Sequence, residues 1–320
     1  MYILGVDIGG TKCAVITAEY DGGNFTLLKK EVCATDLEIS PADMIDKLIS
    51  LAETILEKKP DAIGISCGGP LDSKRGIIMS PPNLPGWDNV EIVKQLQEHF
   101  GVKPKLQNDA NACAMAEWKL GAGKGCDNMI FLTFGTGLGA GLILDGRLYS
   151  GTNDNAGEVG HIRLDRFGPV GYGKSGSFEG FCSGGGIAQL GYIKALEQVQ
   201  AGNCPAYYKK GMSISDVTAK SIAEAADNGD ETAIEVYRIC GEYLGRGLSV
   251  LIDILNPQAI VIGSIFARAH HLLWESAKQT IEKEALSVSA ECCRVLPAEL
   301  GENIGDYASI AVAMEDDYVK

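Results

Sequence analysis

Two short glycine-rich segments in this sequence have the composition of phosphate-binding turns. The first is Asp7-Ile-Gly-Gly-Thr-Lys12 and the second is Gly135-Thr-Gly-Leu-Gly139; each follows an apolar segment. Glycine can adopt positive φ, which lets backbone N–H groups approach an anion closely. One such turn alone is more often an ordinary hairpin. Two of them on opposing domains would contact a triphosphate from both sides, so together they predict phosphoryl-transfer chemistry.

Two other nucleotide motifs fit less well. A dinucleotide-binding interpretation of residues 135–140 fails because a strand, and not a helix, is expected after the glycines. Gly168-Pro-Val-Gly-Tyr-Gly-Lys174-Ser175 matches the pattern of a P-loop, which must open a helix. The glycines at 176, 180 and 184–186 disfavour a helix there, so we interpret this match as coincidence.

The elements that must position these turns alternate between strand and helix. A hydroxyl cap and a proline at Ser40-Pro41 predict the start of a helix, whose apolar residues recur at helical spacing. Strands are expected at 61–66 and 102–106, and helices at 90–100 and 110–120. This alternation indicates an α/β fold with a largely parallel sheet and with ligand groups at the carboxyl ends of strands.

The order of strand, glycine turn with threonine, and strand occurs twice, around residues 7–12 and around 135–139. Such a repeat predicts two related halves, and 320 residues exceed one typical core. We expect a first domain of residues 1–118 plus 298–320 and a second of residues 119–297. A helix at 306–314 would return to pack on the first domain.

Charge and cysteine content exclude several classes of protein. The formal net charge is −14, and no basic cluster interleaved with aromatic residues occurs, so we expect no nucleic-acid partner. The ten cysteines contain no C-x-x-C pair, which favours reduced thiols and a cytoplasmic location. The longest apolar stretch is interrupted by Asp253 and Asn256-Pro257, so we expect no membrane span.

Across essentially its whole length, the chain resembles the ROK family (repressor, open reading frame, kinase) of actin-like sugar kinases. The glycine turns and seven further motifs carry this resemblance, and their order makes it specific. These seven are Gly68-Gly-Pro-Leu-Asp72, Asn83-Leu-Pro-Gly-Trp87, Asn108-Asp-Ala-Asn111, Gly157-Glu-Val-Gly-His161, Glu179, Val261-Ile-Gly263 and Pro297-Ala-Glu-Leu-Gly301. The resemblance implies two actin-like (ribonuclease H-like) domains that face a central cleft.

The resemblance also implies the roles of individual residues. Asp109 would be the general base that takes the proton from the attacking sugar hydroxyl, held ionised by the helix that follows it. The implied sugar contacts are Gly69, Asn83, Asn108, Asp109, Glu158, His161 and Glu179. The implied ATP contacts are Asp7, Gly9, Gly10, Thr11, Lys12, Gly135, Thr136, Gly137 and Gly263. Asp7 would help to hold Mg²⁺, through water.

The sequence departs from the family between His161 and Glu179. Most members have a zinc site there, formed by His161 and three cysteines. Aligned backward from Glu179, the cysteine positions carry Val170, Tyr172 and Ser177. These side chains cannot replace three thiolates, so we predict no zinc, and we expect Tyr172 to fill the vacated volume.

The resemblance thus predicts an ATP-dependent kinase that acts on a hexose or an N-acylhexosamine, glucokinase-like at the 6-OH. Kinases of N-acetylmannosamine, N-acetylglucosamine, fructose or allose are alternatives. A transcriptional repressor would need a DNA-binding extension before Asp7, and only six residues precede it here. A non-catalytic sugar sensor is a further alternative, which the presence of Asp109 disfavours. The resemblance also suggests a homodimer.

Overall fold

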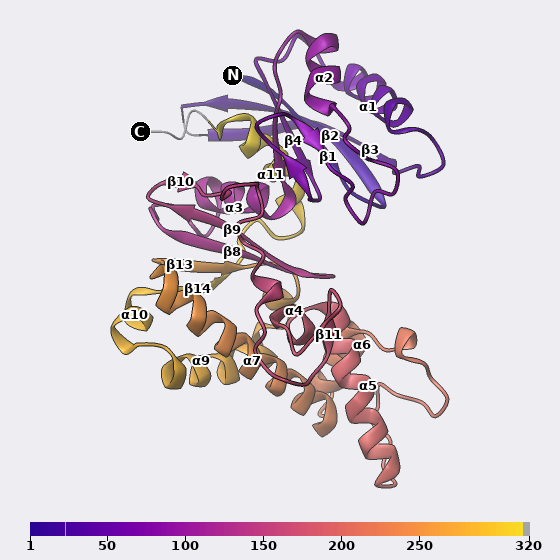
Figure 1. Cartoon of the computed structure of the whole chain (residues 1–320), viewed down its shortest axis with the longest axis vertical. Helices are drawn as coiled ribbons and strands as arrows, with labels where there is room; N and C mark the ends of the chain where they lie inside the picture. Colours follow the sequence, from indigo (N-terminus) through magenta and orange to yellow (C-terminus); the bar gives the residue numbers. More distant parts are fainter. Residues whose placement is uncertain (23, 316–320) are drawn as a thin grey trace. The chain divides into compact units, whose positions relative to one another are not determined.

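The computed structural model describes residues 1–22 and 24–315 (Figure 1). The chain divides into two compact units. The first comprises the described parts of Met1–Asp127, Gly141–Ala156 and Glu299–Lys320, and the second comprises Asn128–Ala140 and Gly157–Ala298. Gly23 and residues 316–320, all within the expected first domain, lie outside the described residues.

The expected division at residue 118 had put residues 119–127 and 141–156 in the second domain. Both segments lie in the first unit instead. Contacts with α3 (Asp109–Leu120) account for both. The indole N–H of Trp118 on α3 donates to the carbonyl of Cys126 at 2.6 Å. In the other segment, a Cβ added to Gly141 would lie 2.5 Å from the carbonyl oxygen of Ala110.

The first unit contains a five-stranded sheet with the order β3-β2-β1-β4-β7. The first three strands are antiparallel, and β4 and β7 run parallel to β1. The apolar residues of the two central strands β1 and β4 are buried almost throughout, as expected for strands covered on both faces. The bounds are β1 Tyr2–Ile8, β2 Lys12–Asp21, β3 Asn24–Ala34, β4 Ala62–Cys67 and β7 Lys105–Asn108.

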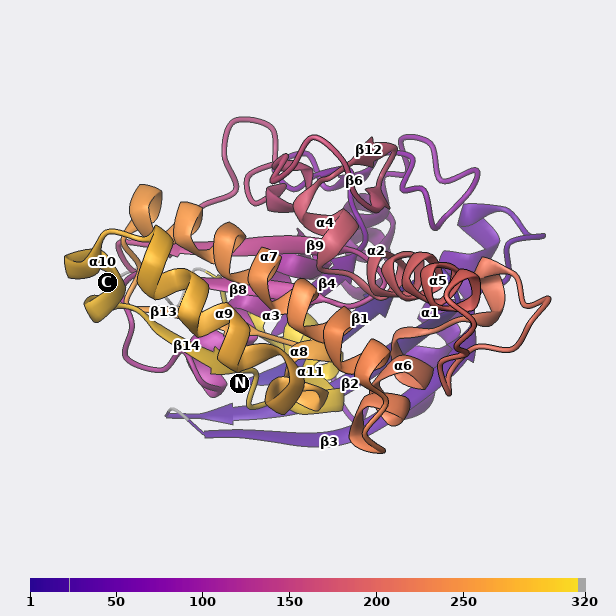
Figure 2. The same ribbon diagram turned by 90° about the horizontal axis from the view of Figure 1, so that it is seen from below.

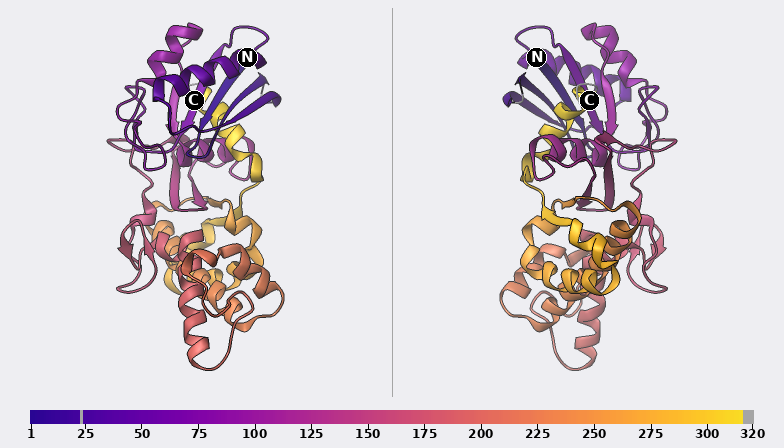
Figure 3. Two further views of the ribbon diagram at one scale, coloured as in Figure 1. Left: turned by 90° about the vertical axis from the view of Figure 1, so that its right-hand side faces the viewer. Right: turned by 90° about the vertical axis from the view of Figure 1, so that its left-hand side faces the viewer.

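Helices cover both faces of this sheet, as the side views show (Figure 3). On one face pack α1 (Pro41–Ile55) and α2 (Ile92–Phe100), and α1 begins at the predicted Ser40 cap. On the other face packs α11 (Ile304–Ala313), which confirms the predicted returning helix. A Cβ on Gly64 would lie 2.0 Å from the carbonyl oxygen of Ser309, so glycine lets α11 approach β4 closely.

The second sheet has the order β10-β9-β8-β13-β14. It contains the antiparallel pair β9 and β10 and three further strands, β8, β13 and β14, where β13 runs parallel to both β8 and β14. This is the strand order of the first sheet repeated, so the predicted internal repeat is confirmed. The bounds are β8 Met129–Phe134, β9 Leu138–Leu144, β10 Arg147–Leu148, β13 Ala259–Ile262 and β14 Arg294–Pro297.

Helices dominate the second unit, and α7 and α9 lie side by side in it (Figures 1 and 2). An apolar stripe runs along the long α7 and is buried. The bounds are α6 Ala219–Asp227, α7 Glu231–Leu255, α8 Ile265–Arg268, α9 His270–Glu284 and α10 Ser287–Cys292. The short elements of the chain are β5 Leu71–Asp72, β6 Ile77–Ile78, β11 Val170–Gly171, β12 Lys174–Ser175, and the 3₁₀-helices Val159–His161, Ile214–Asp216 and Gly301–Asn303.

Two helices form where we expected glycines to prevent them: α4 (Phe178–Phe181) and α5 (Gly184–Gln200). Serine caps outweigh the low helix propensity of glycine, since the hydroxyl of Ser183 accepts from the N–H of Gly186 at 3.0 Å. Close packing also requires glycine, because a Cβ on Gly186 would lie 2.0 Å from the carbonyl oxygen of Gly180. The expectation was therefore wrong.

No helix in residues 1–22 and 24–315 has the length and apolar character needed to cross a membrane.

Candidate active site

The first glycine turn, residues 9–12, connects β1 to β2. Ile8 pairs with Cys13 across the two strands, and the N–H of Gly9 donates to the carbonyl of Lys12 at 3.1 Å. A Cβ on Gly10 would lie 2.5 Å from the carbonyl oxygen of Asn83. Only glycine fits there, so the structure brings the turn and the loop of Asn83 together.

Asp7 lies near the end of β1, and its carboxylate is largely buried. Burial raises the pKa of Asp7 to about 6, a hydrogen bond from Ser66 opposes this, and the negative charges of Asp109 and Asp306 raise it further. A carboxylate in such surroundings gains most from a cation beside it.

Asn108 and Asp109 occupy the junction of β7 and α3, as predicted. The Oδ1 atom of Asn108 accepts from the N–H of Asn111 at 2.7 Å, so Asn108 is the helix cap and Asp109 is the first helical residue. The side chain of Asp109 is accessible to solvent, while its Oδ1 accepts from the N–H of Ala110 at 2.8 Å.

Protein atoms crowd Asp109, and this desolvation raises its pKa; hydrogen bonds from backbone N–H groups oppose the rise. We expected the start of the helix to keep this carboxylate ionised. Its backbone N–H groups do lower the pKa, but desolvation raises the pKa by more. A raised pKa brings a carboxylate closer to the range in which it can accept a proton efficiently.

The sugar-contact residues of the first unit lie where β4 and β7 end. A Cβ on Gly68 would lie 3.0 Å from Oδ1 of Asn83, and one on Gly69 would lie 3.9 Å from Cβ of Asn108. The Gly68-Gly69 segment thus contacts Asn83 on one side and Asn108, the residue before Asp109, on the other, at the carboxyl edge of the first sheet.

The second glycine turn, residues 135–137, connects β8 to β9. The N–H of Gly184, at the start of α5, donates to the carbonyl of Gly135 at 2.8 Å. Oε2 of Glu179 accepts from the N–H of Leu138 at 3.0 Å, and a Cβ on Gly137 would lie 2.8 Å from the same oxygen. Glu179, expected as a sugar contact, thus also holds this turn.

Glu158 is exposed and precedes a 3₁₀-helix that ends with His161. The rings of His161 and Tyr172 meet edge to face with centroids 5.1 Å apart. Tyr172 is nevertheless 71% exposed, so the expectation that it fills a vacated volume was wrong: its positive φ of 44° turns the side chain outward. The ammonium of Lys174 donates to the carbonyl of His161 at 2.7 Å.

The hydrogen bond from Lys174 to His161 disfavours the P-loop interpretation. Lys174 lies in the short strand β12, and its ammonium donates to a nearby backbone carbonyl. Of the three positions that lack the family's cysteines, Val170 and Tyr172 are exposed and Ser177 is the buried cap of α4. Cys182 is buried, and its thiol donates to the carbonyl of Cys240 at 3.6 Å. Residues 1–22 and 24–315 contain no group of three or more His, Cys, Asp or Glu placed to hold a metal ion.

Gly263 follows β13 and is buried, and its N–H donates to the carbonyl of Leu132 at 3.0 Å. The next residue, Ser264, has φ 54° and ψ −112°, a region that suits glycine. Its hydroxyl lies 3.6 Å from a Cβ added to Gly135. The structure thus places Gly263 and the second glycine turn on neighbouring loops.

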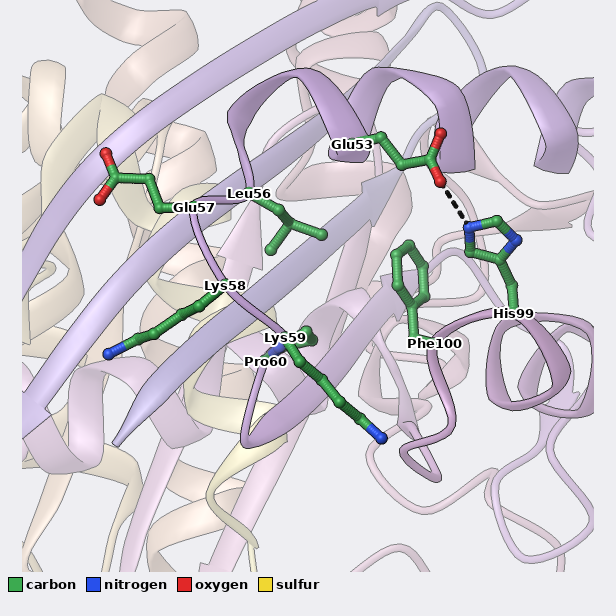
Figure 4. A pocket seen from close by; sticks show the side chains of 8 residues that line it. All are labelled: Glu53, Leu56, Glu57, Lys58, Lys59, Pro60, His99 and Phe100. Carbon is green, nitrogen blue, oxygen red and sulfur yellow. Dashed lines mark hydrogen bonds and ion pairs between the residues drawn. The ribbon is translucent and has the colours of Figure 1, made fainter.

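A surface pocket of the first unit lies elsewhere, at the ends of α1 and α2 (Figure 4). It contains none of the predicted site residues. On its wall, Oε1 of Glu53 lies 2.9 Å from Nε2 of His99, and the ammonium of Lys59 donates to the carbonyl of Gly101 at 3.2 Å. Its polar groups are occupied within the protein, and we assign it no role.

Asp306 was not predicted from the sequence as a residue of the candidate site. It is 8% exposed, its charge raises the pKa of Asp7, and its two carboxylate oxygens lie 2.6 and 2.8 Å from the ammonium of Lys30. The available signal was one acidic residue within the otherwise apolar segment that forms α11.

The sequence model of the ROK family matches residues 3–315 of this chain. The chain belongs to the ROK family. Among curated ROK-like relatives, it is 30% identical to the glucokinase of Thermotoga maritima, over 98% of this chain and 97% of that protein.

Two solved structures of ROK proteins extend the comparison. A ROK glucokinase from Streptomyces griseus, in complex with glucose and AMPPNP, superimposes with a TM-score of 0.75 at 28% identity, covering 98% of each chain. A ROK transcriptional regulator, a homologue of the Escherichia coli MLC protein, gives 0.83 at 25% identity, covering 99% of this chain and 78% of the regulator. The predicted family and the α/β fold with two related halves are confirmed.

Proposed function

We propose that this protein is an ATP-dependent hexose kinase, glucokinase-like, that phosphorylates the 6-OH of its sugar. ROK membership and the likeness to glucokinases over nearly the whole chain support this. The observation that carries the proposal is the position of Asp109: an accessible carboxylate of raised pKa at the carboxyl end of β7, directly after Asn108.

Asp109 acts as the general base. Its carboxylate takes the proton from the sugar hydroxyl while the hydroxyl oxygen bonds to the γ-phosphorus. The bond from that phosphorus to the bridging oxygen breaks, and the electron pair leaves with ADP. Since little other covalent chemistry is required, the remaining residues position and neutralise the phosphates.

The two glycine turns bind the phosphates through their backbone N–H groups. Thr11 and Lys12 add a hydroxyl and an ammonium, and both are exposed. Thr136 lies at the exposed tip of the second turn. The buried Gly263, adjacent to the loop of Gly135, contributes backbone to the nucleotide site.

Asp7 fits a role beside Mg²⁺. Mg²⁺ keeps several waters and binds one or two carboxylates plus substrate phosphates, and Asp7 is one carboxylate, whose pKa is raised mainly by burial. When bound, the ion neutralises charge on the phosphates. Asp7 would hold the ion, and the hydrogen bond from Ser66 holds Asp7 in place.

Glu158, His161 and Glu179, together with Gly69, Asn83 and Asn108, bind the sugar hydroxyls. A site of alternating donors and acceptors rejects ligands that leave its polar groups unpaired. Glucose is the substrate we favour, and N-acetylmannosamine, N-acetylglucosamine, fructose and allose are the alternatives. We also propose that the protein holds no zinc, forms a homodimer, binds no nucleic acid and acts in the cytoplasm.

A coupled assay of ADP release over a panel of these sugars tests the proposal. Turnover with at least one hexose is expected, and Asp109→Asn should lose it while retaining the fold by circular dichroism. Binding of a sugar without turnover of any member of the panel would contradict the kinase assignment.

The fold similarity to a ROK transcriptional regulator favours a sugar-responsive binding protein as the second candidate. Such a protein has no need of a general base. Turnover that depends on Asp109 therefore distinguishes the two functions.

A further inference from the structure

Thr35, the residue after β3, makes two hydrogen bonds to the first glycine turn. Its hydroxyl donates to the carbonyl oxygen of Gly9 at 2.6 Å, and its backbone N–H donates to the carbonyl oxygen of Thr11 at 3.0 Å. We propose that Thr35 is a positioning residue for the phosphates of ATP, because it fixes the direction of the N–H groups of this turn. The inference rests on the proposed kinase function.

The geometry of the peptide unit gives the reason. The C=O and N–H of a trans peptide point in opposite directions. Since Thr35 holds the carbonyl of Gly9, the N–H of Gly10 points away from Thr35, and among the described residues this N–H has no protein acceptor. The bond to Thr11 orients the N–H of Lys12 in the same manner. Thr35 therefore determines which way two peptide units of the turn face.

Cys13 fixes the hydroxyl of Thr35 in turn. The sulfur of Cys13 lies 3.3 Å from Oγ1 of Thr35. The same sulfur lies 3.9 Å from the carbonyl oxygen of Gly9, to which the hydroxyl of Thr35 donates, so the thiol contacts both members of that hydrogen bond. Burial raises the pKa of Cys13 and keeps it a neutral donor. The hydroxyl is thus engaged on both sides.

The same hairpin offers a matched control in Thr17 on β2. Its side chain is fully buried, and its Oγ1 accepts from the N–H of Lys29 on β3 at 3.2 Å. Thr17 therefore also joins two segments of the hairpin through its hydroxyl, as an acceptor where Thr35 is a donor, and does so away from the glycine turn.

The experiment compares Thr35→Val, Thr35→Ser and Thr17→Val in the full-length protein. For each, KM for ATP, KM for glucose and kcat are measured, with ADP binding by calorimetry and the unfolding midpoint. Thr35→Val removes one hydroxyl and leaves the backbone N–H bond intact. We expect KM for ATP and the dissociation constant of ADP to rise about tenfold, the effect of one lost hydrogen bond, with KM for glucose unchanged.

Thr35→Ser keeps the hydroxyl and should restore nucleotide affinity. Thr17→Val should lower the unfolding midpoint without changing nucleotide affinity. If Thr35→Val changes only the midpoint, as Thr17→Val does, the inference is wrong. If the wild-type protein binds ADP but phosphorylates no sugar, the kinase assignment fails, while the comparison of ADP affinities still decides the role of Thr35. A wild-type protein that binds no adenine nucleotide overturns both.

Discussion

The carboxylate of Glu117 accepts a hydrogen bond from the backbone N–H of Leu300 at 2.9 Å, at the point where the chain returns to the first unit. The same carboxylate accepts from the N–H groups of Glu299 and Ala122. Glu117 is fully buried, and it lies on α3, the helix that begins with Asp109. One buried side chain thus joins α3 to the returning segment.

Glu117→Gln should lower the free energy of unfolding by about 1–3 kcal/mol. An amide has one acceptor oxygen where the carboxylate has two, so the substitution leaves a buried N–H unsatisfied. Chemical denaturation measures the change. Glu98→Gln, at an exposed position on α2, is the control and should be neutral. Equal stability of both variants would refute the structural role of Glu117.

Asp109→Asn should lower kcat by on the order of 10²–10⁴, the usual contribution of a general base. Lys174→Ala should leave kcat largely intact, with at most a small rise in KM for the sugar through the lost bond to the His161 carbonyl. Steady-state kinetics with ATP measure both. A large loss of kcat for Lys174→Ala together with a small loss for Asp109→Asn would contradict both assignments and favour the P-loop interpretation.

Activity should fall as pH decreases through the pKa of Asp109, because the base must be ionised to accept a proton. Desolvation by the surrounding protein atoms raises this pKa, so the acid limb of kcat/KM should lie above the value of about 3.9 of an ordinary aspartate. Rates measured from about pH 8 down to about pH 4, with circular dichroism to confirm folding, test this. A limb at the ordinary value would show that the carboxylate is well solvated.

Ser264→Gly should stabilise the protein by about 1 kcal/mol, since glycine adopts φ 54°, ψ −112° without the strain that serine carries. Asn256→Gly is the matched control: Asn256 has φ 43° and ψ 55°, a left-handed conformation that asparagine tolerates. Thermal unfolding should separate the two. No gain for Ser264→Gly over Asn256→Gly would mean that Ser264 is unstrained in solution.

Prolonged dialysis against a zinc chelator should leave the unfolding midpoint and the activity with Mg²⁺ unchanged, because Val170, Tyr172 and Ser177 occupy the positions of the family's thiolates. Elemental analysis of the purified protein provides the independent check. Stoichiometric zinc, or unfolding on its removal, would contradict the prediction.

Repetition and periodicity made most of the fold predictable. The glycine turns, the strands before them and the apolar stripe of α7 depend on local residue types, and the structure shows each of them. The error at residues 184–186 has a physical cause: glycine has low helix propensity in isolation, whereas here Ser183 caps the helix and Gly186 is required by its approach to Gly180.

The contacts that hold the site were less predictable, because they join residues far apart in the sequence. Thr35 reaches Gly9 through the pairing of β2 with β3, and Glu117 reaches Leu300 across most of the chain. Neither shows a local pattern, since a threonine after a strand and a glutamate in a helix are ordinary residues. Only the register of the strands and the course of the chain bring them together.

Glu179 accepts from Leu138 with one oxygen and packs on both Gly160, next to His161, and Gly171, next to Tyr172. A ligand that displaces this carboxylate must therefore alter the second glycine turn, and a ligand on that turn must alter the carboxylate. Thermodynamic linkage makes such an effect reciprocal. On the proposed assignments, sugar and nucleotide would each change the affinity for the other by the same factor.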